Sequence, residues 1–157
     1  MNIKLLCIGK TDDRNLEALI SVYTKRLKHY VNFELEIIPD LKKTKNLSKE
    51  QQKEKEGELI LNKITVQDQL ILLDENGKEL NSLKFADYLQ KKMNSGIKTL
   101  VFVIGGPYGF SEAVYAKAQG KVSLSKMTFS HQMIRLFITE QIYRGFTILR
   151  NEPYHHR

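Results

Sequence analysis

Cysteine and long apolar runs are scarce in this sequence. It contains one cysteine, Cys7, which excludes an intramolecular disulfide and a cysteine-ligated metal site. Apolar runs such as LVFVI at 100–104 are far shorter than the ~20 residues that span a bilayer. The apolar part of the N-terminus is also too short for a secretory signal. We therefore expect a cytoplasmic protein with no membrane association, in which Cys7 is a buried thiol without a reactive role.

The usual phosphate-binding motifs are missing as well. The glycine-rich stretch IGGPYGF at 104–110 has no following Gly-Lys-Ser or Gly-Lys-Thr, and its glycines are not spaced as G-x-G-x-x-G. The sequence GKTDD at 9–13 offers one glycine followed by acidic residues, which repel phosphate. A nucleotide- or flavin-dependent enzyme of the doubly wound class is therefore disfavoured. No Asp, Glu or further His is spaced to complete a metal site with the C-terminal histidines, so we expect no metal.

Positive charge is what the sequence has in excess. The chain has 157 residues and a formal net charge of +7, with 41% hydrophobic and 27% charged residues. The length predicts one domain over 1–157, and the composition is ordinary for a globular protein. The charge favours an anionic partner, of which RNA is the commonest for a small basic protein. A basic enzyme without a nucleic-acid partner stays open as the alternative.

Five segments have the pattern of β-strands, because they are short, rich in Leu, Ile and Val, and bounded by Gly or polar residues. They are 3–8, 33–38, 69–74, 99–104 and 121–129. The continuous apolar runs indicate strands that are covered on both faces. Helical segments alternate with them. The sequence therefore predicts an α/β protein with a mainly parallel sheet of five to six strands and helices on both faces.

The helices are predicted from apolar spacing and from capping residues. The first has an apolar stripe of Leu16, Leu19, Ile20, Tyr23, Leu27 and Tyr30. Ser48 and Gln51 form a capping box for a helix that reaches about residue 64, and Ser82, Ser111 and Ser130 are expected to cap the next three. The charged segment 40–58 is predicted to be mobile or solvated. The sequence DENGK at 74–78 predicts a turn that closes the third strand.

The last predicted helix, 130–149, is apolar around nearly its whole circumference. Such a helix needs burial on more than one side. We expect one side to pack on the sheet and another on a second copy of the protein. Burial entirely within its own chain is the alternative.

Ligands of parallel sheets collect at the carboxyl ends of the strands. The ends at Leu73, at Gly105–Gly106 and at 124–129 offer mostly backbone donors and acceptors beside apolar side chains. This combination suits a flat, neutral ring such as adenine better than a polyphosphate. The alternative for the two glycines is a plain strand-to-helix turn.

The C-terminal part adds polar side chains to these strand ends. His131 opens the last helix, Arg135 and Arg144 interrupt its apolar surface, and the chain ends in NEPYHHR. A tail with an aromatic ring, imidazoles and arginine is able to stack on a base and to bind phosphates. A frayed tail is the alternative.

Four motifs together resemble one known family. IGGPYG, SLSKMTFSHQMIR, EQIYRGF and NEPYHHR are similar to the motifs of the ribosomal large subunit pseudouridine methyltransferase H family, which are SPOUT-type enzymes. IKLLCIGK, KEKEGE and DENGK fit the same pattern, so that the resemblance covers the whole chain. Two residues depart from it: Ser130 stands where the family usually has proline, and Gly145 where alanine is expected.

The resemblance implies a fold, a cofactor and a substrate. The fold would be SPOUT-type with a deep trefoil knot at the C-terminal end, and the protein would be a homodimer. The cofactor would be S-adenosylmethionine, held by Leu73, Gly105, Leu124, Ser125, Lys126, Met127, Thr128 and Phe129. The substrate would be a pseudouridine of 23S ribosomal RNA, methylated at N3 on the assembled ribosome.

For catalysis, we hypothesise that Tyr154 and His155, with Arg144 and His131, assist loss of the N3 proton and stabilise the anionic base. In a dimer the tail is able to reach the cofactor of the partner. The competing interpretation of the sequence is a non-enzymatic, ribosome-associated RNA-binding factor, which would explain the size and charge but would not need the backbone-lined pocket.

Overall fold

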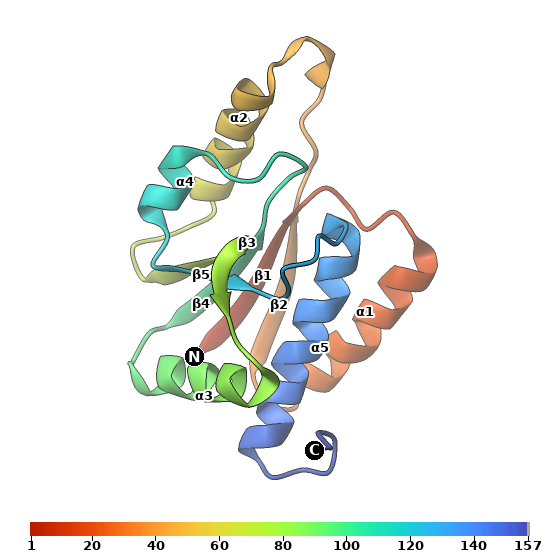
Figure 1. The fold of residues 1–157 in the computed structure, drawn as a ribbon, viewed down its shortest axis with the longest axis vertical. Coiled ribbons are helices and arrows are strands. Elements are labelled where there is room, and N and C mark those ends of the chain that lie inside the picture. The colour runs from red at the N-terminus through yellow and green to blue at the C-terminus, as the bar shows by residue number, and fades with distance from the viewer. Residues whose placement is uncertain (157) are drawn as a thin grey trace.

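The structure is a computed structural model that describes residues 1–156; Arg157, the last residue of the predicted tail, lies outside the described residues. The sheet has the strand order β2-β1-β4-β3-β5, and each neighbouring pair is parallel (Figure 1). This confirms the predicted α/β class with a parallel sheet. The elements are β1 (Asn2–Ile8), α1 (Arg14–Leu27), β2 (Asn32–Ile38), α2 (Lys49–Leu61), β3 (Asp68–Glu79), α3 (Ser82–Asn94), β4 (Thr99–Ile104), α4 (Glu112–Lys117), β5 (Gly120–Ser123) and α5 (His131–Leu149), with a 3-10 turn at Thr44–Asn46.

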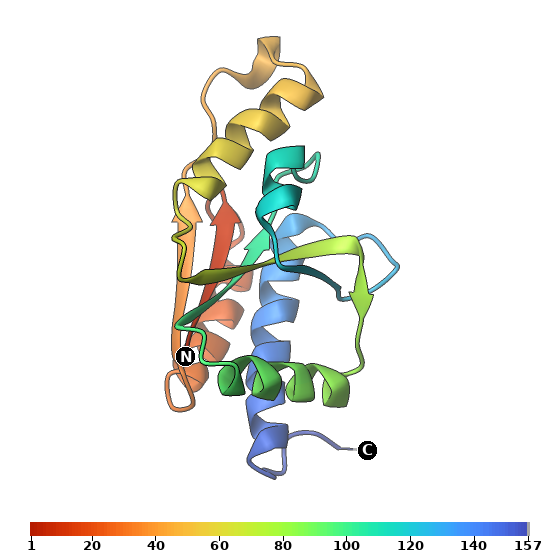
Figure 2. The same ribbon diagram turned by 90° about the vertical axis from the view of Figure 1, so that its left-hand side faces the viewer.

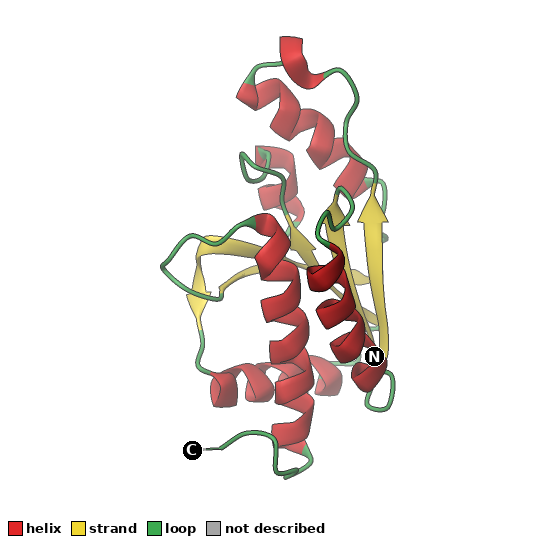
Figure 3. Ribbon diagram, turned by 90° about the vertical axis from the view of Figure 1, so that its right-hand side faces the viewer, coloured by secondary structure: helices red, strands yellow, loops and turns green. Residues whose placement is uncertain are grey.

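Helices cover both faces of the sheet, as predicted. On β1 and β4, Leu5 pairs in register with Phe102, and both side chains pack among residues of α1, α3 and α5. The next residue on each strand, Leu6 on β1 and Val103 on β4, points to the other face of the sheet. There both pack with residues of α2 and α4. Because successive side chains of a strand alternate between faces, continuous apolar strands supply both cores. Figures 1 and 3 show α1 and α5 side by side on their face of the sheet.

The thiol of Cys7 lies in this interior. Its exposed fraction is 0%, which confirms the predicted burial, and burial raises its pKa to about 12, which disfavours the reactive thiolate. No helix within residues 1–156 has the length and apolar character to cross a bilayer.

Helix α5 is the most deeply packed helix. Ile138 and Ile142 are fully buried and join the core cluster formed with α1 and α3. Helix α3 packs closely against α5 at Gly145, because this residue has no side chain. A Cβ at this position would lie 2.8 Å from Leu89 Cδ1. A glycine in a helix interior costs up to ~1 kcal/mol, but here the helix continues without interruption to Leu149.

Two strand boundaries differ from the prediction. β5 ends at Ser123 rather than at 129, because the Ser123 hydroxyl donates to the Ser125 carbonyl (2.9 Å) and turns the chain out of the sheet. The predicted turn at 74–78 is instead part of β3, which Figure 2 shows as one long, bent strand. Its pairing with β5 shifts between Leu73 and Lys78. Gly77 is required there, because a Cβ would lie 2.6 Å from the Val122 backbone.

The helix starts are mostly as predicted. Ser48 and Gln51 form the capping box, and Ser111 and Ser130 cap α4 and α5. The prediction for Ser82 is wrong. Asn81 caps α3 through the Lys84 amide (2.9 Å), and the Ser82 hydroxyl instead donates to Gln141 Oε1 (2.8 Å).

Two expectations about burial are also wrong. Leu19 was predicted on the buried stripe of α1, but its side chain is 50% exposed. The charged segment 40–58 is exposed over most of its lysines, yet from Lys49 it is part of α2, where Glu56 and Gly57 are buried. Spacing along one helix does not reveal these cases, since exposure depends on which neighbouring element covers the residue.

Replacing Ile142 by alanine tests the packing of α5. Because the side chain is fully buried among α1, α3 and the sheet, we expect the Ile142→Ala substitution to lower the free energy of unfolding by about 2–5 kcal/mol. Val66, whose exposed fraction is 92%, is the control, and Val66→Ala should change it by less than about 0.5 kcal/mol. Chemical denaturation measures both; equal effects would contradict the assigned packing.

Candidate functional site

A cleft of ≈ 450 Å³ lies beside residues 73–76 in the middle of β3 and beside the carboxyl ends of β4 and β5. Three chain segments form most of its wall. They are 73–76 in β3, 104–110 at and after the end of β4, and 122–129 at and after the end of β5, with the exception of Lys126. The predicted cofactor residues therefore all line this cleft except Lys126. The side chain of Lys126 is 84% exposed and lies 3.7 Å from Glu79 Oε1 on the surface. Tyr115, His131 and Ile134 complete the lining.

The segment after β4 forms a tight turn. The Gly109 amide donates to the Gly106 carbonyl (3.1 Å), and Gly109 has a φ of 82°, which favours glycine. A Cβ on Gly105 would lie 3.1 Å from the Phe110 ring. The turn therefore presents main-chain groups to the cleft, with the aromatic ring of Phe110 packed beneath them.

The segment after β5 is held by side chain-to-backbone hydrogen bonds. The Ser125 hydroxyl accepts a hydrogen bond from the Met127 amide (2.9 Å). This turn leaves Met127 74% exposed, while the Phe129 ring packs edge-on against Phe137 at 5.2 Å. Met127 and Phe129 therefore give the mouth of the cleft an apolar rim.

Acidic and aromatic side chains occupy the opposite wall, and the sequence analysis missed them. The Tyr115 hydroxyl donates to the Asp74 carboxylate, and Glu75 also lines the cleft. Burial, followed by the hydrogen bond to Asp74, raises the pKa of Tyr115 to about 12. The two residues are far apart in the chain and only the sheet brings them together, so no local pattern predicts the pair. Their presence makes this wall suited to a ligand with a positive charge.

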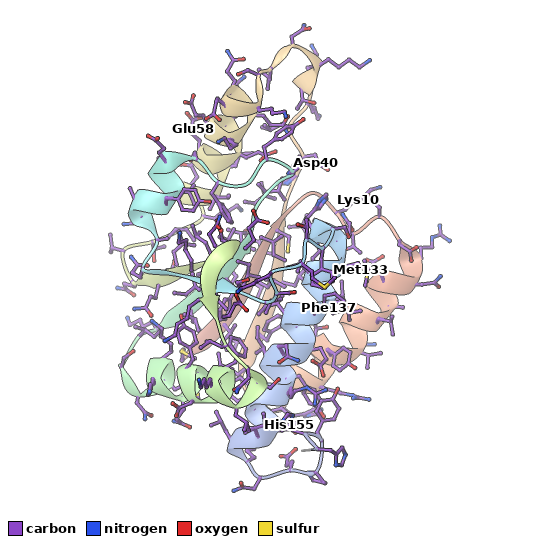
Figure 4. All side chains as sticks on the ribbon, in the orientation of Figure 1. Lys10, Asp40, Glu58, Met133, Phe137 and His155 are labelled. Atoms are coloured by element: carbon purple, nitrogen blue, oxygen red, sulfur yellow. The ribbon has the colours of Figure 1, made fainter. Side chains whose placement is uncertain are left out.

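The four predicted catalytic residues do not form one cluster within the chain. His131 lines the cleft at the first turn of α5. Arg144 lies 13 residues further on, which is about 20 Å along a helix that rises 1.5 Å per residue. His155 follows the far end of α5, as its separation from Met133 in Figure 4 shows. Within residues 1–156, no three His, Cys, Asp or Glu side chains are grouped to hold a metal ion.

The other three predicted catalytic residues lie together: Arg144 and Tyr154 bind Glu140, and His155 contacts Arg144. Glu140 Oε1 accepts hydrogen bonds from Arg144 Nη2 (2.5 Å), Arg144 Nε (3.0 Å) and the Tyr154 hydroxyl (3.0 Å). Arg144 Nη1 lies 3.3 Å from His155 Nδ1, and its guanidinium stands 4.7 Å from the centre of the Tyr154 ring. Burial, with hydrogen bonds to Tyr23 and Glu140, raises the pKa of Tyr154. The tail is therefore anchored on α5 as far as His155, not frayed.

A second hollow of ≈ 860 Å³ lies beside the cleft and shares part of its wall, 122–125 and Phe129. Its other side is formed by residues of α1, α3 and α5, among them Leu19, Phe137 and Arg144. The loop after β5 thus separates two depressions. Only the second one reaches the Arg144 side chain.

An open parallel sheet with a backbone-lined cleft at its strand ends defines a ligand-binding α/β protein. Comparison with known proteins narrows this class. A family model described as "Predicted SPOUT methyltransferase" matches residues 1–155, and the chain belongs to this family.

Curated relatives cover the whole chain. It is 73% identical over 157 residues to a Flavobacterium johnsoniae protein and 68% identical over 157 residues to one from Christiangramia forsetii, with each chain covered in full. Both are named "Ribosomal RNA large subunit methyltransferase H".

A solved structure shares the fold. It is that of "a probable methylase family protein" from Haemophilus influenzae, with a TM-score of 0.54 at 11% identity. The match covers 96% of this chain and 66% of the Haemophilus chain, so at this identity it concerns the fold alone.

Glu140, Arg144, Tyr154 and His155 are here called the Glu140 cluster. We expect the hydrogen bonds of Glu140 to hold the tail on α5. Removing its carboxylate with Glu140→Ala deletes three hydrogen bonds to the tail and to Arg144, each worth about 1.5–3 kcal/mol when a charged group takes part. We expect amide hydrogen exchange at 152–156 to accelerate about tenfold or more, with little change in the core strands.

A matched control is Asp87→Ala, which removes an exposed carboxylate from an i,i+4 pair with Lys91. It should leave exchange in the tail unchanged. Unchanged exchange in the Glu140→Ala variant would show that the tail is held by other contacts.

Proposed function

We propose that this protein is an S-adenosylmethionine-dependent methyltransferase that methylates N3 of a pseudouridine in 23S ribosomal RNA on the assembled ribosome. The observation that carries the proposal is the cleft, with three main-chain walls, one acidic side and His131 at its edge. The names of the curated relatives supply the RNA substrate class. Such an activity belongs in the cytoplasm, where ribosomes are found.

The residues of the cleft fit the proposed cofactor. Amides and carbonyls at Gly105 and along 124–129 suit the edge of an adenine ring, and Leu73 with Phe110 supplies apolar contacts for its faces. Asp74 and Glu75 would face a positively charged group. S-adenosylmethionine would supply an activated methyl group on a sulfonium. Lys126, which points to the surface, is not expected to contact it.

The protein then has to orient the base and manage one proton. The N3–H group of pseudouridine is a weak acid and must lose its proton during attack. His131 stands at the cleft, where its imidazole is able to accept a proton. Arg144, Tyr154 and His155 supply a guanidinium, a phenol and a second imidazole that would stabilise the anionic base. Holding both reactants in line contributes several kcal/mol more.

These groups reach one site only if two chains contribute. Along α5, Glu140 lies about 14 Å and Arg144 about 20 Å from His131 at the cleft of the same chain. Two helices carry exposed apolar side chains: on α1, Leu19 is 50% and Val22 42% exposed, and on α5 Met133 is 37% exposed. Such side chains are covered in dimers. We therefore infer a homodimer in which the tail of one chain serves the cleft of the other. The trefoil knot is part of the same proposal, since the family is of the SPOUT type.

Affinity for RNA is attributed to lysines near the cleft. The segment 41–49 contains Lys42, Lys43, Lys45 and Lys49, all exposed, and no acidic residue. It projects from one end of the molecule in Figures 1 and 2. Lys49 Nζ stands 5.5 Å from the centre of the Tyr108 ring, which lines the cleft. A polyanion bound to this segment would therefore pass the mouth of the cleft.

Calorimetry with S-adenosylmethionine, followed by methyl transfer to intact ribosomes, tests the activity. We expect binding and transfer by the wild type, and feeble transfer to naked RNA, because a chain this small reads the shape of an assembled site. Absence of cofactor binding would instead favour a non-enzymatic ribosome-associated factor.

Complementation between variants tests the shared site. Tyr154→Ala and Gly105→Val should each abolish transfer, the first through the tail and the second by crowding the Phe110 ring and displacing the turn that lines the cleft. In a mixture that exchanges subunits, half of the dimers are mixed and carry one intact site, so about a quarter of the activity should return. If no activity returns although mixed dimers form, the tail does not act on the partner.

The salt dependence of ribosomal RNA binding tests the lysine segment. The triple substitution Lys42→Ala, Lys43→Ala and Lys45→Ala should weaken binding and lower the slope of log affinity against log salt by about 2. Cofactor binding should not change. Lys98, an exposed lysine just before β4, gives the control Lys98→Ala. An unchanged slope in the triple variant would exclude this surface.

A further inference from the structure

Glu56 is a buried carboxyl group that lies just outside the cleft. Its exposed fraction is 4%, although it belongs to the charged helix α2. Oε1 accepts a hydrogen bond from Gln52 Nε2 (3.0 Å), whereas Oε2 is buried and has no hydrogen-bond partner among residues 1–156. A buried carboxylate oxygen without a donor is costly, so this group calls for a physical explanation.

The unpartnered oxygen faces the glycine turn. A Cβ added to Gly106 would lie 2.2 Å from Glu56 Oε2, so the carboxyl occupies the place where a side chain would begin. The next residue, Gly57, approaches the other end of the same segment: its Cβ would lie 2.3 Å from Ser111 Oγ. Helix α2 therefore contacts both ends of the segment that links β4 to α4. This segment forms one wall of the cleft.

The surroundings favour the neutral form of this carboxyl. Burial is the main cause that raises the pKa of Glu56, and the negative charge of Asp40 raises it further. The hydrogen bond from Gln52 and the positive charge of His131 act in the opposite direction, and the net pKa shift is upward. This carboxyl lies beside a turn whose other side lines the cleft.

We propose that Glu56 is a positioning residue whose neutral carboxyl supports the Gly105–Gly106 turn from behind, and whose ionisation loosens this wall of the cleft. A charged carboxylate in this place would have to draw a donor or water toward Oε2, and the Gly106 backbone is the group it touches. Affinity for the cofactor should therefore fall as pH rises through the ionisation of Glu56. That part of the inference rests on the proposed function.

Three variants separate charge from packing. Glu56→Gln keeps the shape and stays neutral, Glu56→Ala removes the support, and Glu58→Gln changes an exposed carboxyl of the same helix. Figure 4 shows Glu58 and Asp40 on opposite sides of α2, so Glu58 serves as the matched control.

Calorimetry with S-adenosylhomocysteine, across a series of pH values from acidic to mildly alkaline, gives the first readout. We expect Glu56→Gln to bind like the wild type at low pH and several-fold more tightly at high pH. Glu56→Ala should bind about tenfold more weakly throughout, and Glu58→Gln like the wild type. Turnover at saturating cofactor should be unchanged in Glu56→Gln, since the effect concerns affinity. The ratio of the affinities of wild type and Glu56→Gln at each pH is the quantity that reports on the charge of Glu56.

The inference is overturned if wild type and Glu56→Gln have the same pH dependence, or if Glu56→Ala binds like the wild type. A second readout needs no cofactor: amide exchange at 105–110, compared between wild type and Glu56→Gln at the same pH. Exchange should be equal at low pH and faster in the wild type at high pH. If the wild type binds no cofactor, the proposed function fails, and the exchange measurement alone then tests whether Glu56 supports the turn. The same measurement tests this role if Glu56→Ala does not fold.

Thermal unfolding shows in which direction the ionisation of Glu56 changes the stability of the fold. A carboxyl whose pKa is raised in the folded state stabilises the fold below its unfolded pKa, and this contribution is lost as pH rises through the folded pKa. The melting temperature of Glu56→Gln should therefore exceed that of the wild type at high pH by more than it does at low pH. A constant difference would contradict a proton held at Glu56.

Discussion

Parallel pairing of β3 with both β4 and β5 is the constraint on which the rest of the structure depends. Parallel strands end at the same edge of a sheet, so the turns that follow them have to share one space. The turns after β4 and β5 are rich in glycine and serine and present backbone to the cleft, whereas β3 continues to Glu79 and contributes Asp74 and Glu75 from its middle. Where the chain runs closest, at Gly77 over the Val122 backbone and at Gly106 against Glu56, any side chain would push the segments apart.

Two helices connect this edge of the sheet to the rest of the molecule. Helix α2 reaches the glycine turn from behind through Glu56 and Gly57, and it carries the basic segment at its beginning. Helix α5 runs from His131 at the cleft through Glu140 at its middle, where Tyr154 of the tail binds, and on to Arg144. One packed helix thus separates the polar groups that the proposed chemistry needs to bring together. For this reason the proposed activity requires the proposed dimer.

Much of the fold could be predicted because it follows from local rules. Apolar strands buried on both faces, a capping box at Ser48 and serine caps at Ser111 and Ser130 are properties of short segments. The errors arose where a distant segment decides the outcome. Asn81 caps α3 because the Ser82 hydroxyl has a partner on α5. Leu19 is exposed because no element of the same chain covers it.

By itself, the sequence determined the class of fold, the order of its elements and the strand ends that line the cleft, because these depend on hydrophobic period and on turn residues. Only the tertiary structure decided that Lys126 points away, that Asp74 meets Tyr115, that a buried carboxyl lies behind Gly106, and that Tyr154 binds Glu140 rather than lying beside His131. These are contacts between residues remote in the chain. Their geometry is set by how the sheet and helices pack, and no local pattern encodes that packing.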